Sequence, residues 1–330
     1  MGNNILDTST IFLYSRTMAN EINTLQEAIL HFSDPENCLN YLVARRWPKG
    51  VVCPTCGSRS VSFIPSRRVW QCKTRHAKCQ FSVKVGTIFE DSPIGLDKWL
   101  AAMWMVANCK NGVSSYEIAR DLGVTQKTAW FMLHRIRLAL QGEDSGKLGG
   151  EVEVDETFIG GKARNMHTSV KPRRITGGKD KAAVVGIVKR GGKIRTTVVP
   201  NRKKSALQAE VRRHVEPGSV LYTDALLSYN GLEEEYTHLV IDHARCYVEG
   251  KVHTNTLENF WSVLKRGISG TYISVEPFHL FRYLDEQAFR YNYRNDMNDG
   301  DRFELAASQI IGKRLTYAEV TGKVGETTLN

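Results

Sequence analysis

The amino-acid sequence predicts an α/β core preceded by a small cysteine-rich segment and a helical unit. Residues 151–161, EVEVDETFIGG, alternate valine with acidic residues, and this period of two is typical of a strand with two unlike faces. A short apolar run from Val220 to Tyr222 indicates a second, buried strand that ends at Thr223 and Asp224. Between them we expect two strands, AAVVGIVKR and KIRTTVVP, and a helix, SALQAEVRRHV. The predicted core order is strand, strand, strand, helix, strand, with a later helix.

Length and composition favour a soluble protein of more than one unit. With 330 residues the chain exceeds the usual size of one domain, so we expect two or three units. The net charge of +10 suits a polyanionic partner, although charge alone does not separate DNA from RNA or acidic surfaces. No segment approaches the roughly 18 apolar residues of a membrane span. We expect a cytoplasmic, nucleoid-associated protein with no membrane contact, in which residues 1–25 form a tail.

Residues 26–92 contain a cysteine cluster with the spacing of a zinc site. In an intracellular protein such a cluster favours metal over disulfides. The segment CPTCG places Cys53 and Cys56 at a knuckle spacing, and Cys72 follows a predicted strand, RRVWQ. The fourth ligand is either His76 or Cys79, and the shorter step from Cys72 favours His76. We predict a structural Zn²⁺ ion that folds this segment and takes no part in catalysis.

The following unit, residues 93–142, is predicted to be helical. LDKWLAAMWMVANCKNG forms one helix that stops at Asn111-Gly112. SSYEIARDLGVTQKTAWFMLHRIRLAL then gives a short helix, a turn at Gly123 and a second helix, which is a helix-turn-helix pattern. The residues expected to face outward and to contact DNA are Gln126, Lys127, Thr128 and Arg135. The alternative is a plain three-helix packing unit. Residues 143–150 form a linker to the core.

Acidic residues mark the core as a candidate catalytic domain. Asp155 interrupts a valine-rich strand and Asp224 ends another, while HTNTLENFWSVLKRGISGTY places Glu258 and Lys265 seven residues apart on one face of a helix. A single strand-end aspartate is more often a turn former or helix cap, and a Glu and Lys pair is usually a solvated helix face. In combination, the three acids indicate metal-dependent phosphoryl transfer, in which two divalent cations about 4 Å apart stabilise the charge that develops on the reacting oxygens.

Four blocks of sequence extend this interpretation to a family. The motifs VDETFIGGK, YTDALLSY, HTNTLENFWSVLKR and FRYNYR, in this order behind a cysteine-rich N-terminus, resemble the DDE transposases of bacterial insertion sequences, in the zinc-ribbon branch related to eukaryotic Merlin elements. The resemblance covers roughly residues 26–320. It implies an RNase H-like catalytic domain over residues 151–300, followed by a C-terminal helix and tail over residues 301–330.

The resemblance also implies an activity and a set of site residues. Asp155, Asp224 and Glu258 correspond to the three acids that hold two Mg²⁺ or Mn²⁺ ions, with Asp155 bridging both; because some members use asparagine as the third ligand, Asn255 stays an alternative to Glu258. Lys265 is expected to contact a DNA phosphate. The implied enzyme binds terminal inverted repeats of double-stranded DNA, cleaves strands, transfers them to target DNA, and works as a homodimer or a higher assembly.

Further residues and two rival functions remain open at this stage. The basic segment Lys162 to Lys181 could contact DNA or could be a solvated loop. His253 and His243 are weaker candidates for a phosphate contact, since a structural histidine is at least as common. The rivals are a non-catalytic, transposase-derived DNA-binding regulator and an RNase H-like nuclease without a joining step.

Overall fold

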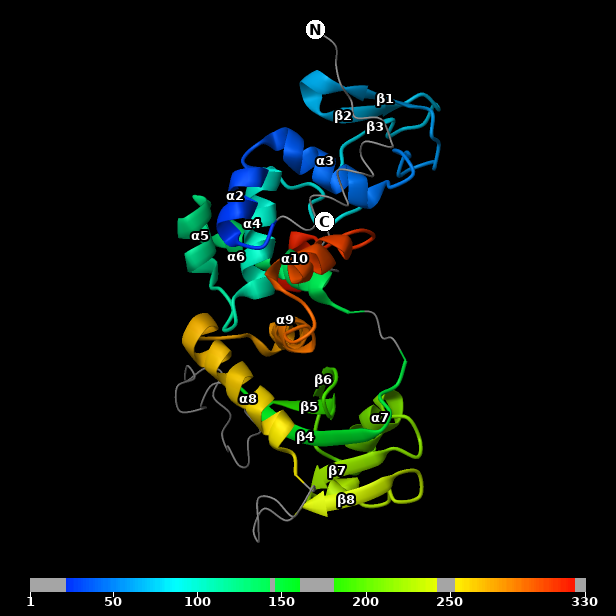
Figure 1. Cartoon of the computed structure of the whole chain (residues 1–330), viewed down its shortest axis with the longest axis vertical. Helices are drawn as coiled ribbons and strands as arrows, with labels where there is room; N and C mark the ends of the chain where they lie inside the picture. Colours follow the sequence, from blue (N-terminus) through cyan, green and yellow to red (C-terminus); the bar gives the residue numbers. More distant parts are fainter. Residues whose placement is uncertain (1–21, 143–145, 161–180, 242–252, 324–330) are drawn as a thin grey trace. The chain divides into compact units, whose positions relative to one another are not determined.

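The computed structural model describes residues 22–142, 146–160, 181–241 and 253–323, which form two compact units (Figure 1). The first unit contains the chain up to Cys109, the segment from Val113 to Leu140, and the chain from Asn295 onward. The second unit contains Lys110–Gly112 and Gln141–Arg294. The basic segment up to residue 180 and His243 lie outside the described residues. Among the helices that are described, none has the length and apolar character needed to cross a membrane.

The first unit combines a three-stranded antiparallel sheet with helices. In chain order its elements are α2 (Leu25–Phe32), α3 (Pro35–Arg46), β1 (Val61–Ile64), β2 (Val69–Cys72), β3 (Gln80–Phe81), α4 (Leu96–Asn108), α5 (Ser115–Leu122), α6 (Gln126–Leu140), α10 (Asp299–Ser308) and α11 (Tyr317–Thr321). The sheet order is β1-β2-β3. Trp70 of β2 stacks on Phe81 of β3, with ring centroids 6.0 Å apart, and Trp47 packs edge-on against Trp70. These aromatic contacts provide most of the apolar packing of a very small sheet.

Strand β3 is shorter than the sequence predicts. The segment FSVKVG favours a strand that begins at Phe81, but β3 ends there. Beyond it the chain forms turns in which the Ser82 hydroxyl accepts from the N–H of Lys84 and the Thr87 hydroxyl donates to the carbonyl of Lys84. Short hydroxyl side chains offer the backbone such local partners, and these compete with strand pairing.

Local signals in the sequence explain the ends of α5. Ser114 and Glu117 form a capping box at its start: the Ser114 hydroxyl accepts the N–H of Glu117, and the Glu117 carboxylate accepts the N–H of Ser114. Gly123 ends the helix in the left-handed conformation, with φ of 60°. Glycine takes this conformation without steric cost, so the chain can turn sharply into α6.

The C-terminal helix α10 is part of the first unit. Phe303 is fully buried against Phe32 and Tyr41, and Glu304 forms an ion pair with Arg45 and accepts a hydrogen bond from the Tyr41 hydroxyl. Residues near both ends of the described chain therefore share one core, a pairing of distant segments that no local pattern predicts.

The second unit is built on a five-stranded mixed sheet. Its elements are β4 (Glu151–Ile159), β5 (Ala182–Lys189), β6 (Ile194–Val199), α7 (Lys204–His214), β7 (Val220–Asp224), β8 (Thr237–Ile241), α8 (Asn255–Gly267), a π-helical turn (Ile268–Tyr272) and α9 (Leu280–Asn292). The sheet order is β6-β5-β4-β7-β8. Neighbouring strands are antiparallel from β6 to β4 and parallel from β4 to β8. The strand order along the chain agrees with the sequence prediction, which did not include the largely exposed edge strand β8.

Helices cover both faces of this sheet. On one face α7 packs with Leu207 and Val211 against Val152 and Val154 of β4. On the other face α8 and α9 pack against β5 and β6, with Trp261 and Leu284 in the core. The alternation of β4 thus sends its even-numbered side chains toward α7 and its odd-numbered side chains toward α8.

Candidate active site and metal centres

Asp155 and Asp224 lie side by side because of the register of two parallel strands. β4 pairs with β7 so that Glu153 is opposite Tyr222. The same register carried two residues further sets Asp155 level with Asp224, the last residue of β7. Ligands of α/β sheets bind at the carboxyl ends of parallel strands, which is where Asp224 lies. The two acids that are far apart in the sequence therefore meet at one place on the sheet.

Glu156 joins them in an acidic group that the sequence analysis did not foresee. Asp155, Glu156 and Asp224 each offer a carboxylate oxygen, and these oxygens lie within 4.8 Å of one another. The Glu156 carboxylate accepts hydrogen bonds from the Tyr229 hydroxyl, at 3.0 Å, and from the Arg202 guanidinium, at 3.1 Å. Both of its oxygens are thus engaged within the protein. The sequence signal that points to Glu156 is its position directly after Asp155 in an apolar strand.

Burial and the close approach of these carboxylates change the ionisation of Asp155 and Glu156. Burial raises the pKa of Asp155 to about 7, and the negative charges of Glu156 and Asp224 add to this effect; the hydrogen bond from Trp261 opposes it. The pKa of Glu156 is also raised, first by burial and then by the charge of Asp224. Three acids so close together repel one another, and a bound cation relieves that repulsion. The donor set consists of carboxylate oxygens, the ligands that Mg²⁺ and Mn²⁺ prefer, so the residues fit a divalent metal.

Another acid of β4, Glu153, fixes the start of helix α8. Its fully buried carboxylate accepts the main-chain N–H groups of Thr256, at 3.0 Å, and Leu257, at 3.3 Å, as well as the Thr256 hydroxyl. It also forms an ion pair with Arg190 at 2.9 Å. The cap residue Thr254 makes no side-chain cap bond of its own. Because the first N–H groups of a helix lack partners within it, a carboxylate here satisfies them and interacts favourably with the helix dipole.

The structure does not bring Glu258 into the acidic group. Its side chain is exposed in the first turn of α8, three residues before Trp261, and Asn255 and Lys265 are exposed on the same helix. Trp261 itself is buried and donates its indole N–H to Asp155. Residues three apart occupy neighbouring positions on a helix surface, so Glu258 lies next to Trp261 on α8.

His253 has a structural environment. Its Nδ1 lies 3.4 Å from Glu153 and its main-chain carbonyl accepts a hydrogen bond from Arg190 at 2.8 Å. These contacts hold it at the entry to α8, and the sequence-based suggestion of a phosphate contact stays untested.

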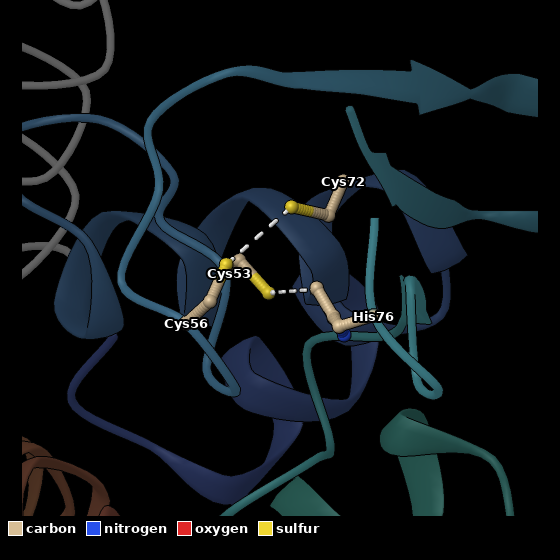
Figure 2. Close-up of side chains that lie close together, drawn as sticks. All are labelled: Cys53, Cys56, Cys72 and His76. Carbon is tan, nitrogen blue, oxygen red and sulfur yellow. Dashed lines mark hydrogen bonds between the residues drawn. The ribbon is translucent and has the colours of Figure 1, made fainter. Parts of the chain in front are cut away.

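Four side chains of the first unit converge on one point, as Figure 2 shows. Cys53 and Cys56 come from the turn before β1, Cys72 from the end of β2 and His76 from the following loop. Their ligand atoms lie within 4.8 Å of one another. Cys79, the alternative fourth ligand, is not in this group; its main-chain carbonyl accepts the N–H of Cys72 instead, at 2.7 Å.

The dimensions of this cluster fit a tetrahedral zinc ion. Zn–S bonds of about 2.3 Å imply sulfur atoms about 3.8 Å apart at the corners of a tetrahedron. The Sγ atoms of Cys56 and Cys72 are 3.6 Å apart, and Cys53 Sγ is 3.4 Å from Nε2 of His76. Burial opposes ionisation of the Cys53 thiol, but hydrogen bonds from the main chain of Cys56 and Thr55 and from the neighbouring thiols outweigh it and lower its pKa to about 6. Thiolates are the form that binds metal.

The prediction that Arg135 faces outward was wrong. Arg135 does not face outward but is buried, with 4% of its surface exposed. Its guanidinium donates to the main-chain carbonyls of Leu315, Ile88 and Glu90, at 2.7 to 3.0 Å. The side chain therefore satisfies carbonyl groups of two loops inside the first unit, a role that depends on tertiary neighbours and is invisible in the helical pattern.

The other three residues lie at the start of α6. Lys127 is exposed, with its ammonium 5.0 Å from the centre of the Tyr317 ring. Gln126 and Thr128 are half-buried: Gln126 donates to the Ser115 hydroxyl at 2.9 Å, and Thr128 bonds to the Thr125 hydroxyl. A lysine at an exposed helix start can meet a phosphate as a mobile charge.

Comparison with known proteins gives the family context of both sites. Residues 147–292 match the model of an ISXO2-like transposase domain, and residues 33–80 match the model of a transposase zinc-ribbon domain. A relative described as an uncharacterized protein in transposable element ISH50, from Halobacterium salinarum, is 30% identical over 256 residues, which cover 72% of this chain and 84% of the relative. An uncharacterized transposase-like protein from Haemophilus influenzae is 34% identical over 101 residues, 30% of this chain and 81% of that protein.

The zinc cluster predicts a difference between two substitutions. His76→Ala should lower the zinc content of the purified protein and loosen the packing of Trp70, because three ligands bind Zn²⁺ more weakly than four and the metal provides folding energy. Metal analysis and tryptophan fluorescence measure both effects. Cys79→Ser is the matched control and should retain zinc; loss of zinc from Cys79→Ser with retention in His76→Ala would reverse the assignment.

The raised pKa of Asp155 predicts pH-dependent metal binding. In the metal-free protein this carboxyl group is protonated below pH about 7. A cation must displace that proton, so Mn²⁺ affinity should fall about tenfold per pH unit below 7 and level off above 8. Titration of free Mn²⁺ by electron paramagnetic resonance measures this. Glu156→Gln removes one repelling charge and should shift the loss of Mn²⁺ affinity to lower pH. A Mn²⁺ affinity that stays the same between pH 6 and pH 8 would contradict the prediction.

Proposed function

Because the chain belongs to the family of insertion-sequence transposases that join an ISXO2-like transposase domain to a transposase zinc ribbon, we propose that it binds terminal inverted repeats and catalyses metal-dependent DNA strand cleavage and strand transfer. The observation that carries this proposal is the meeting of Asp155 and Asp224 on neighbouring parallel strands, inside the segment that matches the transposase domain. A regulator that only binds DNA has no need of an acidic cluster in which the pKa of Asp155 is raised.

The arrangement of the second unit supports an RNase H-like fold. Three consecutive antiparallel strands, β4 to β6, are followed by helix α7 and by β7, which returns parallel to β4. β8 then extends the sheet beyond β7. This is the order that the resemblance to DDE transposases implies, and it places the first strand at the centre, where it contributes acidic side chains to both faces.

Asp155 and Asp224 hold the metal ions, and Glu258 completes the set. Bound Mg²⁺ or Mn²⁺ stabilises the attacking and leaving oxygens of the phosphodiester during an in-line displacement. We assign the third position to Glu258 over Glu156 because the resemblance places the third acid on this helix, and because Glu156 is already paired with the positively charged Arg202. Glu258 is exposed and belongs to the helix that contacts Asp155 through Trp261. Lys265, two turns further along α8, contacts a DNA phosphate.

The first unit recognises DNA in this proposal. α5, the turn at Gly123 and α6 form a helix-turn-helix, in which Gln126, Lys127 and Thr128 approach the duplex at the start of the second helix. Zinc stabilises the neighbouring ribbon and does not act in catalysis. Because transposition joins two DNA ends, the active form is a homodimer or a higher assembly of this cytoplasmic, nucleoid-associated protein.

Removing an acid should abolish chemistry and spare binding. Asp155→Ala, Asp224→Ala and Glu258→Gln should each lower the rates of strand cleavage and strand transfer at least about a hundredfold, since metal ligation contributes several kcal/mol to the transition state. Labelled inverted-repeat DNA and a target plasmid, with Mg²⁺ or Mn²⁺, measure both steps. Gel-shift affinity should stay within a few-fold of the unsubstituted protein.

The same assay tests the assignment of the third acid and the joining step. If Glu156→Gln loses activity while Glu258→Gln retains it, the third ligand is Glu156. If the protein cleaves DNA but never transfers the 3′ end to a second duplex, it is a nuclease and the transposase proposal fails.

DNA binding should depend steeply on salt through exposed cations. The logarithm of the binding constant should fall with the logarithm of salt concentration, with a slope near −0.9 per phosphate contact, because binding releases condensed counterions. Lys127→Ala should make the slope less negative by about 0.9, the value of one phosphate contact. Lys189→Ala, at an exposed position of β5, should leave the slope unchanged. Fluorescence anisotropy over a range of salt concentrations measures the slopes. An unchanged slope for Lys127→Ala would remove this residue from the interface.

A further inference from the structure

Trp261 links helix α8 directly to the first acid of the site. It is a buried residue of α8, with 4% of its surface exposed, and its indole N–H donates a hydrogen bond of 2.9 Å to Oδ2 of Asp155. Asp155 comes from β4, so this bond joins two segments that are more than a hundred residues apart in the chain. Nothing in the helical pattern of the sequence separates this tryptophan from an ordinary core residue.

Gly186 makes room for the indole. It lies in β5 directly opposite Asp155 in the antiparallel register. A β-carbon at this position would lie 2.5 Å from Cζ2 of Trp261 and 2.8 Å from Cδ2 of Leu257, which is closer than atoms can pack. A glycine in a buried strand weakens the strand but permits close approach by another group. Here the close approach puts the indole N–H within reach of the carboxylate.

The bond from Trp261 is one of two that fix the Asp155 carboxylate. The other oxygen, Oδ1, accepts the main-chain N–H of Glu156 at 2.8 Å. Each carboxylate oxygen can accept about two bonds, so one donor on each oxygen leaves a lone pair of each for a metal ion. A donor on each oxygen also restricts rotation of the group, and a ligand held in its binding orientation loses less entropy when a metal binds.

We propose that Trp261, seated over Gly186, is a positioning residue that holds the Asp155 carboxylate in the orientation that binds the divalent metal. The proposal rests on the assignment of Asp155 as a metal ligand under the proposed function. Groups that hydrogen-bond to metal ligands typically change metal affinity or activity by about 10- to 100-fold when they are removed. Trp261 acts through Asp155 and does not itself touch the reacting atoms.

Glu153 helps to keep the indole in place by holding the first turn of α8. By accepting the N–H groups of Thr256 and Leu257, it anchors the first turn of α8 to β4. Trp261 follows little more than one turn later and bonds to the same strand two residues further along, at Asp155. Two contacts to one strand define both the position and the direction of this part of the helix. The indole N–H is therefore directed at Asp155.

Trp261→Phe tests the proposal, because phenylalanine keeps an aromatic ring in the core and loses the N–H donor. We expect Mn²⁺ affinity, measured by electron paramagnetic resonance in the absence of DNA, to fall by about 10- to 100-fold. The concentration of Mn²⁺ that gives half-maximal strand cleavage should rise by a similar factor. At saturating Mn²⁺ much of the activity should return, which a loss of folded protein would not allow.

Two control variants separate positioning from stability. Trp99→Phe removes a comparable buried bond, from the indole N–H to the Ser92 hydroxyl at 3.0 Å, in the other unit, and should leave Mn²⁺ affinity unchanged. Leu264→Ala creates a cavity under the same helix α8 and should lower the melting temperature without the change in Mn²⁺ affinity. An equal loss of affinity in Leu264→Ala and Trp261→Phe would overturn the proposal in favour of a merely structural role.

The outcome for Asp155→Ala separates this inference from the proposed function. If Asp155→Ala abolishes Mn²⁺ binding and Trp261→Phe binds Mn²⁺ as tightly as the unsubstituted protein, the positioning role is wrong and the metal site stands. If Asp155→Ala binds Mn²⁺ normally, the metal assignment itself fails.

Discussion

The second unit depends on holding mutually repelling carboxylates together at the end of a pair of parallel strands. Like charges repel, yet the register of β4 against β7 holds together the carboxylates of Asp155, Glu156 and Asp224. Ionisation of Asp155 is therefore unfavourable: burial and the two acidic neighbours raise its pKa to about 7. A cation bound among these carboxylates would relieve their repulsion. The sheet and its register thus create a site whose charge suits a divalent metal.

The surrounding contacts decide which acids are available. Glu156 is bound to Tyr229 and Arg202 on the α7 side of the strand, and Glu153 caps α8 on the opposite side. Each is already paired with an arginine, Glu156 with Arg202 and Glu153 with Arg190. Asp155 faces α8, where Trp261 and the Glu156 N–H orient it. A single strand therefore carries acids with different roles, which follow from the neighbours that each side chain meets.

The first unit stabilises its small sheet and its helices in different ways. The three-stranded sheet of the first unit is too small for hydrophobic burial alone, and Cys53, Cys56, Cys72 and His76 converge where a zinc ion would tie its loops together. The helices around it instead rely on capping, on aromatic packing around Phe303, and on buried charge such as Arg135, which satisfies carbonyl groups of two loops. In both cases, buried polar groups lie where main-chain atoms or neighbouring ligands need partners.

The sequence by itself determined the family, the order of strands and helices in the core, and the likeness of Cys53 and Cys56 to a zinc knuckle. These features are local: alternation in β4, a capping box at Ser114, a glycine at position 123, and short ligand spacings can all be read within one segment. Only the tertiary structure decided that Glu156 joins Asp155 and Asp224, that Glu258 stays outside that group, that Arg135 is buried, and that Trp261 contacts Asp155. Each of these depends on which distant segments become neighbours, and a pattern along one strand or helix carries no information about the element that packs against it.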